Sequence, residues 1–289
     1  MPIEADGQYL AAAGYHLTFY GQLAIQRLGG SEIPLTSEMT ADEASIGQFV
    51  DRDIVQSMIW LDSFGRRAEA DILARHLAVT LDDPVEIALL AQLAETRGDH
   101  QLSLQIGKLA SNRGLAVDAI AFPMTALPDD FESGHSETAL IYAIARQESA
   151  FDNEALSSAG AIGLLQMLPT TAREMASNID VLFSQERLTE AEYNAVLGGA
   201  YLQTLLDRYR GSLVLTLAAF NAGLGRADRW IEIYGDPRSV GIDVIDWIER
   251  IPFDETRNYV QRVLENLQVY RARLGDASLR LGEDLGLPG

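Results

Sequence analysis

The chain has 289 residues, enough for one large domain or two modest ones, and 47% of them are hydrophobic, so a sizeable core can be buried. Acidic residues outnumber basic ones by 42 to 22, and the net charge of −20 argues against binding to nucleic acid or to anionic lipid. The absence of cysteine excludes disulfides, a thiol nucleophile and cysteine-ligated zinc.

The start of the chain, MPIEADGQYL, has no basic region followed by an apolar one, so no secretory signal is visible. No apolar run reaches the ~18 residues that a membrane span needs, so we expect no span. The expectation from these features is a cytoplasmic protein, or a chain that lacks its leader.

Helical periodicity runs through the first half of the sequence. It predicts one helix over residues 9–28, which ends at a glycine pair, and four more helices beyond a polar stretch, at 49–64, 67–81, 84–97 and 101–113. Helices joined by such short loops are typical of hairpins that stack into a solenoid. His16, His76 and His100 are isolated and have no second ligand one turn away, so we expect no metal site.

The amino-acid composition changes at residues 122–135, which read FPMTALPDDFESGH. Two prolines, a glycine and several acids predict a connection between domains. We therefore expect two domains, an α-helical superhelical domain at 1–128 and a second helical domain at 129–289.

The second half opens with a predicted helix over residues 138–149, TALIYAIARQES, which is apolar nearly all round and therefore expected to be buried. Glu148 follows Ile141 and Ile144 by seven and four residues, so it lies on the same face as these apolar side chains. Burial and the negative end of the helix dipole both raise a carboxyl pKa, which favours a general acid. The alternative is a surface carboxylate, or one paired with Arg146 or Arg173.

A polar loop follows, with glycines at Gly160 and Gly163 that suit positive φ or close approach of a ligand. Gln166 lies between Leu165 and Met167, and an amide among apolar neighbours needs a hydrogen-bonding partner, which a ligand could supply. Pro169 suits the first turn of another helix.

Four further helices are predicted after this loop. They run from residue 189 to a stop at Gly211, over 213–220, over 226–234, and from an N-cap at Asp254 to Gly275.

Four blocks in the second half, taken in order, resemble the catalytic domain of the soluble lytic transglycosylases, lysozyme-like enzymes that cut peptidoglycan. The blocks are ARQESAF, SSAGAIGLLQMLP, AAFNAG and IPFDETRNYV, within residues 139–274. The first half is similar to the α-superhelical region of the long members. The resemblance implies an all-α protein, a helical-hairpin solenoid followed by a lysozyme-like catalytic domain.

The resemblance also implies roles for individual residues. Glu148 matches the single catalytic acid/base. Residues of the four blocks match positions near the acid or the bound sugar, which gives a substrate-binding set of Ser149, Ser157, Gln166, Met167, Phe220, Asn221, Glu255 and Tyr259.

The sequence departs from the family pattern at two of these places. Phe220 stands where most members have tyrosine, and Leu168 stands where methionine is common. The acid is retained. Because Phe220 lacks the tyrosine hydroxyl group, it stays open how the reaction intermediate is stabilised, and Tyr259 is a candidate to compensate.

Most glycosidases need two carboxylates. The nearest to Glu148 in sequence are Asp152 and Glu154, and Asp152 is better explained as a turn former. Glu255 follows a predicted N-cap, where an acid stabilises a helix N-terminus, although the resemblance places it in the groove. With one buried acid, a substrate-assisted path is the natural alternative.

The expected reaction is cleavage of the β-1,4 bond between N-acetylmuramic acid and N-acetylglucosamine. The substrate N-acetyl group assists, a 1,6-anhydromuramoyl product forms, and no metal or cofactor is required. The alternatives are a hydrolytic muramidase on the same fold and a non-catalytic glycan-binding protein. The resemblance implies peptidoglycan strands as the partner and a periplasmic location, and leaves cell-wall assembly partners unknown.

Overall fold

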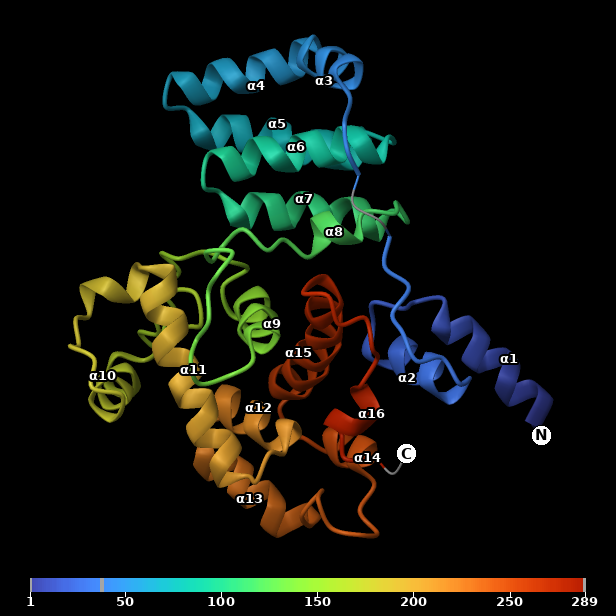
Figure 1. Cartoon of the computed structure of the whole chain (residues 1–289), viewed down its shortest axis with the longest axis vertical. Helices are drawn as coiled ribbons and strands as arrows, with labels where there is room; N and C mark the ends of the chain where they lie inside the picture. The colour runs from blue at the N-terminus through green and yellow to red at the C-terminus, as the bar shows by residue number, and fades with distance from the viewer. Residues whose placement is uncertain (1, 37–38, 288–289) are drawn as a thin grey trace. The chain divides into compact units, whose positions relative to one another are not determined.

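The computed structural model describes residues 2–36 and 39–287, and in them every regular element is a helix (Figure 1). The predicted all-α class is confirmed. The chain separates into two compact units. Unit 1 comprises residues 1–34, 130–149 and 153–289, and unit 2 comprises residues 35–129 and 150–152.

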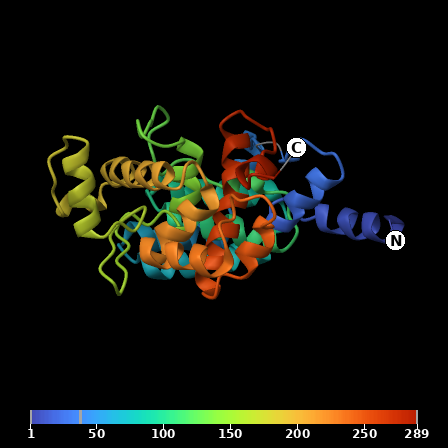
Figure 2. The ribbon, with the colours of Figure 1, turned by 90° about the horizontal axis from the view of Figure 1, so that it is seen from below.

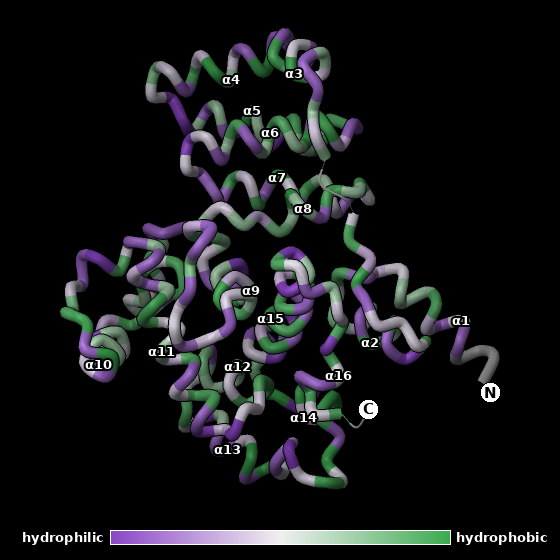
Figure 3. The backbone as a smooth tube through the Cα atoms, viewed as in Figure 1, coloured by the Kyte–Doolittle hydropathy of each residue, from purple (hydrophilic) through white to green (hydrophobic). Residues whose placement is uncertain are grey.

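Unit 2 is a stack of helices joined by short turns. Its elements are α3 (Glu43–Val50), α4 (Asp53–Ser63), α5 (Arg67–Thr80), α6 (Pro84–Thr96), α7 (His100–Asn112) and the short α8 (Asp118–Ala121). Hydrophobic and hydrophilic residues alternate in patches along α4 to α7, as expected for amphipathic helices that each bury one face (Figure 3). The predicted hairpin arrangement is therefore present, since α4 packs on α5 and α6 packs on α7.

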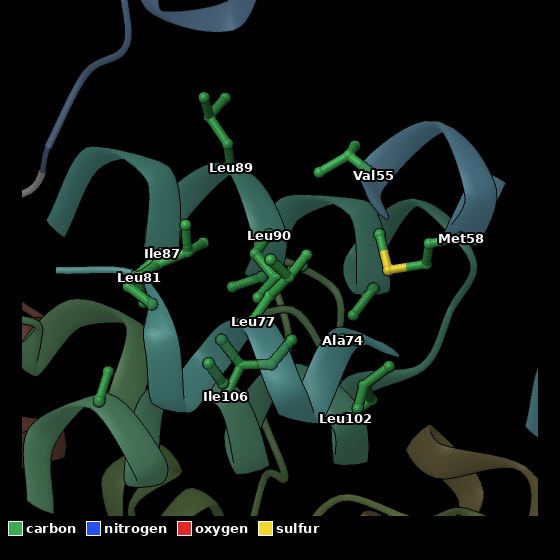
Figure 4. Close-up of a cluster of buried hydrophobic side chains, with 14 of the residues drawn as sticks. Val55, Met58, Ala74, Leu77, Leu81, Ile87, Leu89, Leu90, Leu102 and Ile106 are labelled. Atoms are coloured by element: carbon green, nitrogen blue, oxygen red, sulfur yellow. The ribbon is translucent and has the colours of Figure 1, made fainter. Parts of the chain in front are cut away.

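The core of unit 2 is almost entirely aliphatic. Leu77, Leu90 and Ile106 point toward one another from α5, α6 and α7 (Figure 4), and none is more than 3% exposed. Polar caps set the helix starts, because Asp83 and Asp99 accept hydrogen bonds from backbone N–H groups in the first turns of α6 and α7.

Unit 1 contains the remaining helices. They are α1 (Pro2–Ala13), α2 (Phe19–Arg27), α9 (Thr138–Glu148), α10 (Pro169–Asn178), the 3₁₀ helix η1 (Glu186–Thr189), α11 (Ala191–Arg208), α12 (Leu213–Ala222), α13 (Leu224–Tyr234), α14 (Val244–Glu249), α15 (Asp254–Arg273) and α16 (Leu281–Asp284). Within this unit α1 projects outward and carries the N-terminus at its free end (Figure 1 and Figure 2).

Helices α9 and α15 pack against each other at the centre of unit 1. The rings of Tyr142 and Tyr270 stack across this contact with centroids 5.2 Å apart. Residues 139–145 of α9 are all buried, as the apolar sequence predicted. The buried guanidinium of Arg271 on α15 holds Glu137, the N-cap residue of α9, through two hydrogen bonds of 2.7 and 2.9 Å. The helix packing and this ion pair, which lies at the N-terminal end of α9, together hold α9 against α15.

Helix α2 joins the same centre although it comes early in the sequence. The Phe19 N–H donates to the Glu265 carboxylate at 2.6 Å, and the fully buried Gln22 amide donates to the Glu265 carbonyl oxygen at 3.0 Å. Compactness therefore groups residues 1–34 with the later part of the chain rather than with residues 35–129. The division into domains at 1–128 and 129–289 stays a prediction.

Two of the predicted helices in the first half are wrong in their extent. The helix predicted at 9–28 is two helices, because Thr18 caps α2 by accepting from the Gly21 N–H, and the chain turns between Ala13 and Phe19. The helix predicted at 49–64 is likewise α3 and α4, separated at Asp51 and Arg52.

Candidate active site

Glu148 is the last residue of α9, and its side chain is half-buried. Burial raises the pKa of its carboxyl group from 4.5 to about 7, because the ionised form loses hydration. Both protonation states of Glu148 are therefore accessible near neutrality, and the group can both donate and accept a proton there. The raised pKa expected from the sequence is confirmed.

Helix α15 supplies two side chains that act on this carboxyl group. Tyr259 is 3% exposed, and its hydroxyl lies against the Glu148 carboxyl group, an interaction that lowers the Glu148 pKa. The hydroxyl completes no hydrogen bond of ordinary geometry within the described part of the chain. Burial, and then the Glu148 charge, raises the pKa of Tyr259 well above its usual value. Tyr259 therefore remains a neutral donor aimed at the acid.

Glu255 lies one turn before Tyr259, in the first turn of α15, and is exposed. Its negative charge raises the pKa of Glu148. The predicted N-cap at Asp254 is wrong by one residue, because Phe253 holds that position and Asp254 is the first helical residue. Residues four apart share a helix face, so Glu255 and Tyr259 both face Glu148.

The loop between α9 and α10 is held by backbone bridges at Leu156–Ile162 and Ile162–Met167. Gly160 and Gly163 have φ of 81° and 79°, as their residue type predicted. At Gly163 a Cβ atom would lie 2.1 Å from the Leu188 carbonyl oxygen, so only glycine fits.

The hydroxyl groups of both predicted serines form hydrogen bonds with backbone atoms of this loop. Ser149 is buried, and its Oγ donates to the Leu164 carbonyl oxygen at 2.8 Å, which ties the loop to the end of α9. Ser157 Oγ accepts from the Ala161 N–H at 3.0 Å and closes a turn. Their contact with substrate stays a prediction.

Gln166 lies in the same loop at φ 47°, a conformation that side chains other than glycine rarely adopt. Its amide nitrogen donates to the carbonyl oxygens of Ala155 and Gly163, at 3.1 and 2.9 Å. Its amide oxygen accepts nothing from the described residues and so remains available to a donor on a ligand. Met167, by contrast, is 2% exposed, so its side chain contributes to packing.

Helix α12 places the remaining predicted residues near its C-terminal end. Asn221 Oδ1 accepts from Thr256 Oγ1 at 2.7 Å, so the amide is fixed against α15 and its nitrogen is left as a donor. The half-buried Phe220 ring packs against Tyr201 of α11 with centroids 5.5 Å apart. The structure thus links Asn221 to α15, and α15 to Glu148.

Two positioning residues were missed by sequence reasoning. Asn194 on α11 is fully buried, and its side chain accepts from the Leu165 N–H at 2.8 Å and donates to the carbonyl oxygens of Ile162 and Leu188 at 2.9 and 2.8 Å. Thr256 holds Asn221 in the same way. The signal for Asn194 was available: a polar residue in the apolar stripe of a buried helix needs partners.

No group of three or more His, Asp or Glu side chains in the described residues is arranged to hold a metal ion. None of the helices that the structure describes is both long and apolar enough to cross a membrane.

Residues 131–239 match the family model of the transglycosylase SLT domain. This region is an SLT domain. Residues 250–278, which include the whole of α15, match the model of the soluble lytic transglycosylase helical domain. The family resemblance expected from the four sequence blocks is confirmed, and the two matches include Glu148 and Tyr259 respectively.

Similarity to known proteins extends beyond the SLT domain. The soluble lytic murein transglycosylase of Escherichia coli K12 is 32% identical over an alignment of 277 residues that covers 89% of this chain and 39% of that protein. The crystal structure of the 70 kDa soluble lytic transglycosylase of E. coli matches with a TM-score of 0.75 and 27% identity, over 97% of this chain and 44% of that one.

An inactive glutamate-to-glutamine mutant of the Pseudomonas aeruginosa lytic transglycosylase Slt matches with a TM-score of 0.71 and 32% identity, over 94% and 44% of the two chains. The present chain thus spans less than half of the length of these relatives. The expected succession of helical hairpins and a lysozyme-like catalytic region is confirmed by the similarity to these structures.

Proposed function

We propose that the SLT domain cleaves peptidoglycan strands as a lytic transglycosylase, with Glu148 as the single acid/base. The observation that carries the proposal is a largely desolvated carboxyl group with a pKa of about 7, which interacts with the Tyr259 hydroxyl group and is repelled by the charge of Glu255. Relatives that match 89% of the chain are named as murein transglycosylases, which supports the choice of substrate.

The proposed reaction begins with the protonated form of Glu148, which donates its proton to the oxygen of the β-1,4 bond between N-acetylmuramic acid and N-acetylglucosamine. That bond breaks, and the carbonyl oxygen of the muramoyl N-acetyl group attacks the anomeric carbon from behind. Glu148, now ionised, removes the proton from the C6 hydroxyl group. The C6 oxygen then displaces the N-acetyl oxygen, and the 1,6-anhydro ring closes without a water molecule.

The Tyr259 hydroxyl supports the ionised half of this cycle, because its interaction with Glu148 lowers the pKa of the acid. Glu255 supports the protonated half, because its charge raises that pKa. A group that must give and then take a proton is served by a pKa near the working pH. The arrangement therefore suits a single residue with two successive roles.

Replacement of the acid tests the assignment directly. We expect Glu148→Gln to keep the fold and to lower the rate of release of soluble fragments from purified sacculi by about 10³-fold, in line with loss of a general acid. Retention of the rate by this variant would remove Glu148 from the mechanism.

The product distinguishes lytic cleavage from hydrolysis. Mass spectrometry of the released muropeptides should find the anhydro form, lighter by one water than the hydrolytic product. A reducing-end product would instead identify a hydrolytic muramidase, and binding to sacculi without any soluble product would identify a glycan-binding protein.

Peptidoglycan lies outside the cytoplasmic membrane, so we place the protein in the periplasm. One soluble lytic transglycosylase has been crystallised as a complex with bulgecin A, and that structure matches this chain with a TM-score of 0.72. Binding of bulgecin A by this chain, measured by calorimetry, would support a shared site.

A further inference from the structure

Arg226 and Phe253 form a cation–aromatic pair in unit 1. The guanidinium carbon of Arg226 lies 5.1 Å from the centre of the Phe253 ring. The buried Trp230 ring meets Phe253 edge-on, with centroids 5.6 Å apart and an interplanar angle of 83°. Phe253 is nevertheless 43% exposed, so a large part of its ring surface is open to a ligand.

The pair is attached to both helices that carry the candidate site. Arg226 Nη1 donates to the carbonyl oxygen of Ala222, the last residue of α12, at 2.9 Å. Asn221 directly precedes Ala222, and Phe253 is the N-cap of α15, two residues before Glu255. The 2.7 Å hydrogen bond from Thr256 to Asn221 joins these two helix ends. The pair therefore flanks the Asn221 side of the candidate site.

Arg226 is one of several arginines of the chain, Arg229 and Arg250 among them, that have no carboxylate of the described residues within ion-pairing distance, although acidic residues outnumber basic ones. By comparison, Arg257 in the first turn of α15 pairs with Asp254 at 2.6 Å. One N–H of the Arg226 guanidinium is used by Ala222, and the others remain available.

A guanidinium group binds carboxylates through paired N–H donors, and an exposed aromatic ring packs against the apolar face of a sugar ring. Muramoyl residues present both features, a pyranose ring and an acyl substituent that ends in carboxylates. That substituent is either the stem peptide or, where the peptide is missing, the free lactyl group.

We propose that Arg226 and Phe253 form a subsite for a muramoyl residue, in which Phe253 packs against the sugar and Arg226 binds a carboxylate of its acyl substituent. This inference rests on the proposed function. It makes Arg226 a residue that determines specificity for charged glycan strands.

Binding to an inactive form tests the subsite without turnover. In the Glu148→Gln background, calorimetry would compare three strands: strands that carry stem peptides, strands stripped by an amidase to free lactyl carboxylates, and stripped strands capped as methylamides. We expect Arg226→Gln to weaken binding of carboxylate-bearing strands roughly tenfold and to change binding of capped strands less than twofold. If Arg226→Gln weakens binding of stem-bearing strands alone, Arg226 binds a carboxylate of the stem peptide. If it also weakens binding of stripped strands, Arg226 binds the lactyl carboxylate.

Further variants distinguish specific binding by Arg226 and Phe253 from a general effect of positive charge. Arg226→Lys should restore part of the affinity, because it keeps the charge but loses the planar fork. Phe253→Leu should weaken binding of all three strands to the same extent, because the ring contacts the sugar and not the carboxylate. Arg210→Gln, which removes another exposed cation of unit 1, should leave the three affinities unchanged.

Two outcomes overturn the proposal. One is an equal loss of affinity for capped and carboxylate-bearing strands in Arg226→Gln, and the other is no loss for any strand. Absence of cleavage by the unmodified chain would count against the proposed function, whereas these binding results would still decide the subsite.

Discussion

Unit 1 and unit 2 are both helical, but they bury different kinds of side chain. Ten of the twelve buried polar or charged residues identified in the described part of the chain belong to unit 1, and only Ser103 and Asp118 belong to unit 2. Unit 1 is about twice as long as unit 2, so length alone does not explain the difference. The interior of unit 2 is a set of aliphatic contacts, whereas that of unit 1 also orients polar groups.

The difference indicates that unit 1 buries polar groups which lower the stability of the fold but are held in defined positions. In unit 2, removal of aliphatic area from water stabilises the stack without any demand on protonation. In unit 1, burial raises the pKa of Glu148 and of Glu265, so the folded state disfavours their charged forms. Such groups cost stability and are retained where their chemistry or their hydrogen bonds are needed.

The largest expected effect contrasts one buried residue from each unit. Asn194→Ala leaves the Leu165 N–H and the Leu188 carbonyl oxygen without partners and removes one of the two hydrogen bonds to the Ile162 carbonyl oxygen, and Leu90→Ala leaves a cavity in the aliphatic core. Each should lower the free energy of unfolding by about 3 kcal/mol in urea titrations.

Activity should then separate these two variants. Asn194 holds the loop that carries Gln166, so we expect Asn194→Ala to lower kcat on peptidoglycan roughly tenfold or more where the protein is still folded. Leu90→Ala should leave kcat unchanged under the same conditions. Equal losses of kcat in both variants would contradict the positioning role of Asn194.

The next prediction concerns the stability cost of the acid itself. The folded-state pKa of Glu148 is about 7 against 4.5 in the unfolded chain, so the folded state binds a proton that the unfolded state has lost between these pH values. The free energy of unfolding should therefore fall by up to about 3 kcal/mol as the pH rises from 4.5 to 7, because ionisation of Glu148 is easier in the unfolded chain than in the folded one. Glu148→Gln should accordingly be more stable than the unmodified chain at pH 8, and close to it at pH 4.5. Thermal unfolding at the two pH values measures the difference, and a variant that is less stable at pH 8 would show that the carboxylate is better solvated than we infer.

A smaller effect is expected at Tyr259. Its hydroxyl lowers the pKa of Glu148, so Tyr259→Phe should raise that pKa and move the alkaline limb of the kcat/KM profile to higher pH. Because the pKa of Glu148 is about 7, a higher pKa should increase the acid form at pH 7 by about twofold at most. Titration of the Glu148 carboxyl by NMR would separate this shift from any loss of kcat.

The smallest expected effect has the opposite sign. Glu255 raises the pKa of Glu148 and contributes less than Tyr259, so Glu255→Gln should move the same alkaline limb to lower pH by a smaller amount. The activity at pH 7 should fall by less than about twofold from this cause. Shifts of the same sign in the Tyr259 and Glu255 variants would be incompatible with the electrostatic arrangement described here.

Much of the site could be read from local sequence. Apolar residues one and two turns before Glu148 place it on a buried face, and burial accounts for most of its raised pKa. The positive φ of Gly160 and Gly163 follows from residue type. What could not be read was the side-chain bonding: the hydroxyl groups of Ser149 and Ser157 hold the loop through hydrogen bonds to its backbone, while their contact with substrate stays a prediction.

Helix boundaries were least predictable where a local cap competes with an apolar pattern. The stretch from Tyr9 to Leu28 looks continuous, but the Thr18 side chain captures the Gly21 N–H and starts a new helix. Long-range partners were equally invisible, since Gln22 and Glu265 are 243 residues apart in the chain.

The sequence by itself determined the all-α class, the buried helix that ends at Glu148 and the four blocks of the SLT domain, because helical periodicity and residue order are local properties. The tertiary structure decided which groups surround the acid. Tyr259 and Glu255 come near it only because α9 and α15 pack together in unit 1, and the pKa of a carboxyl group depends on the solvent, charges and dipoles around it in space.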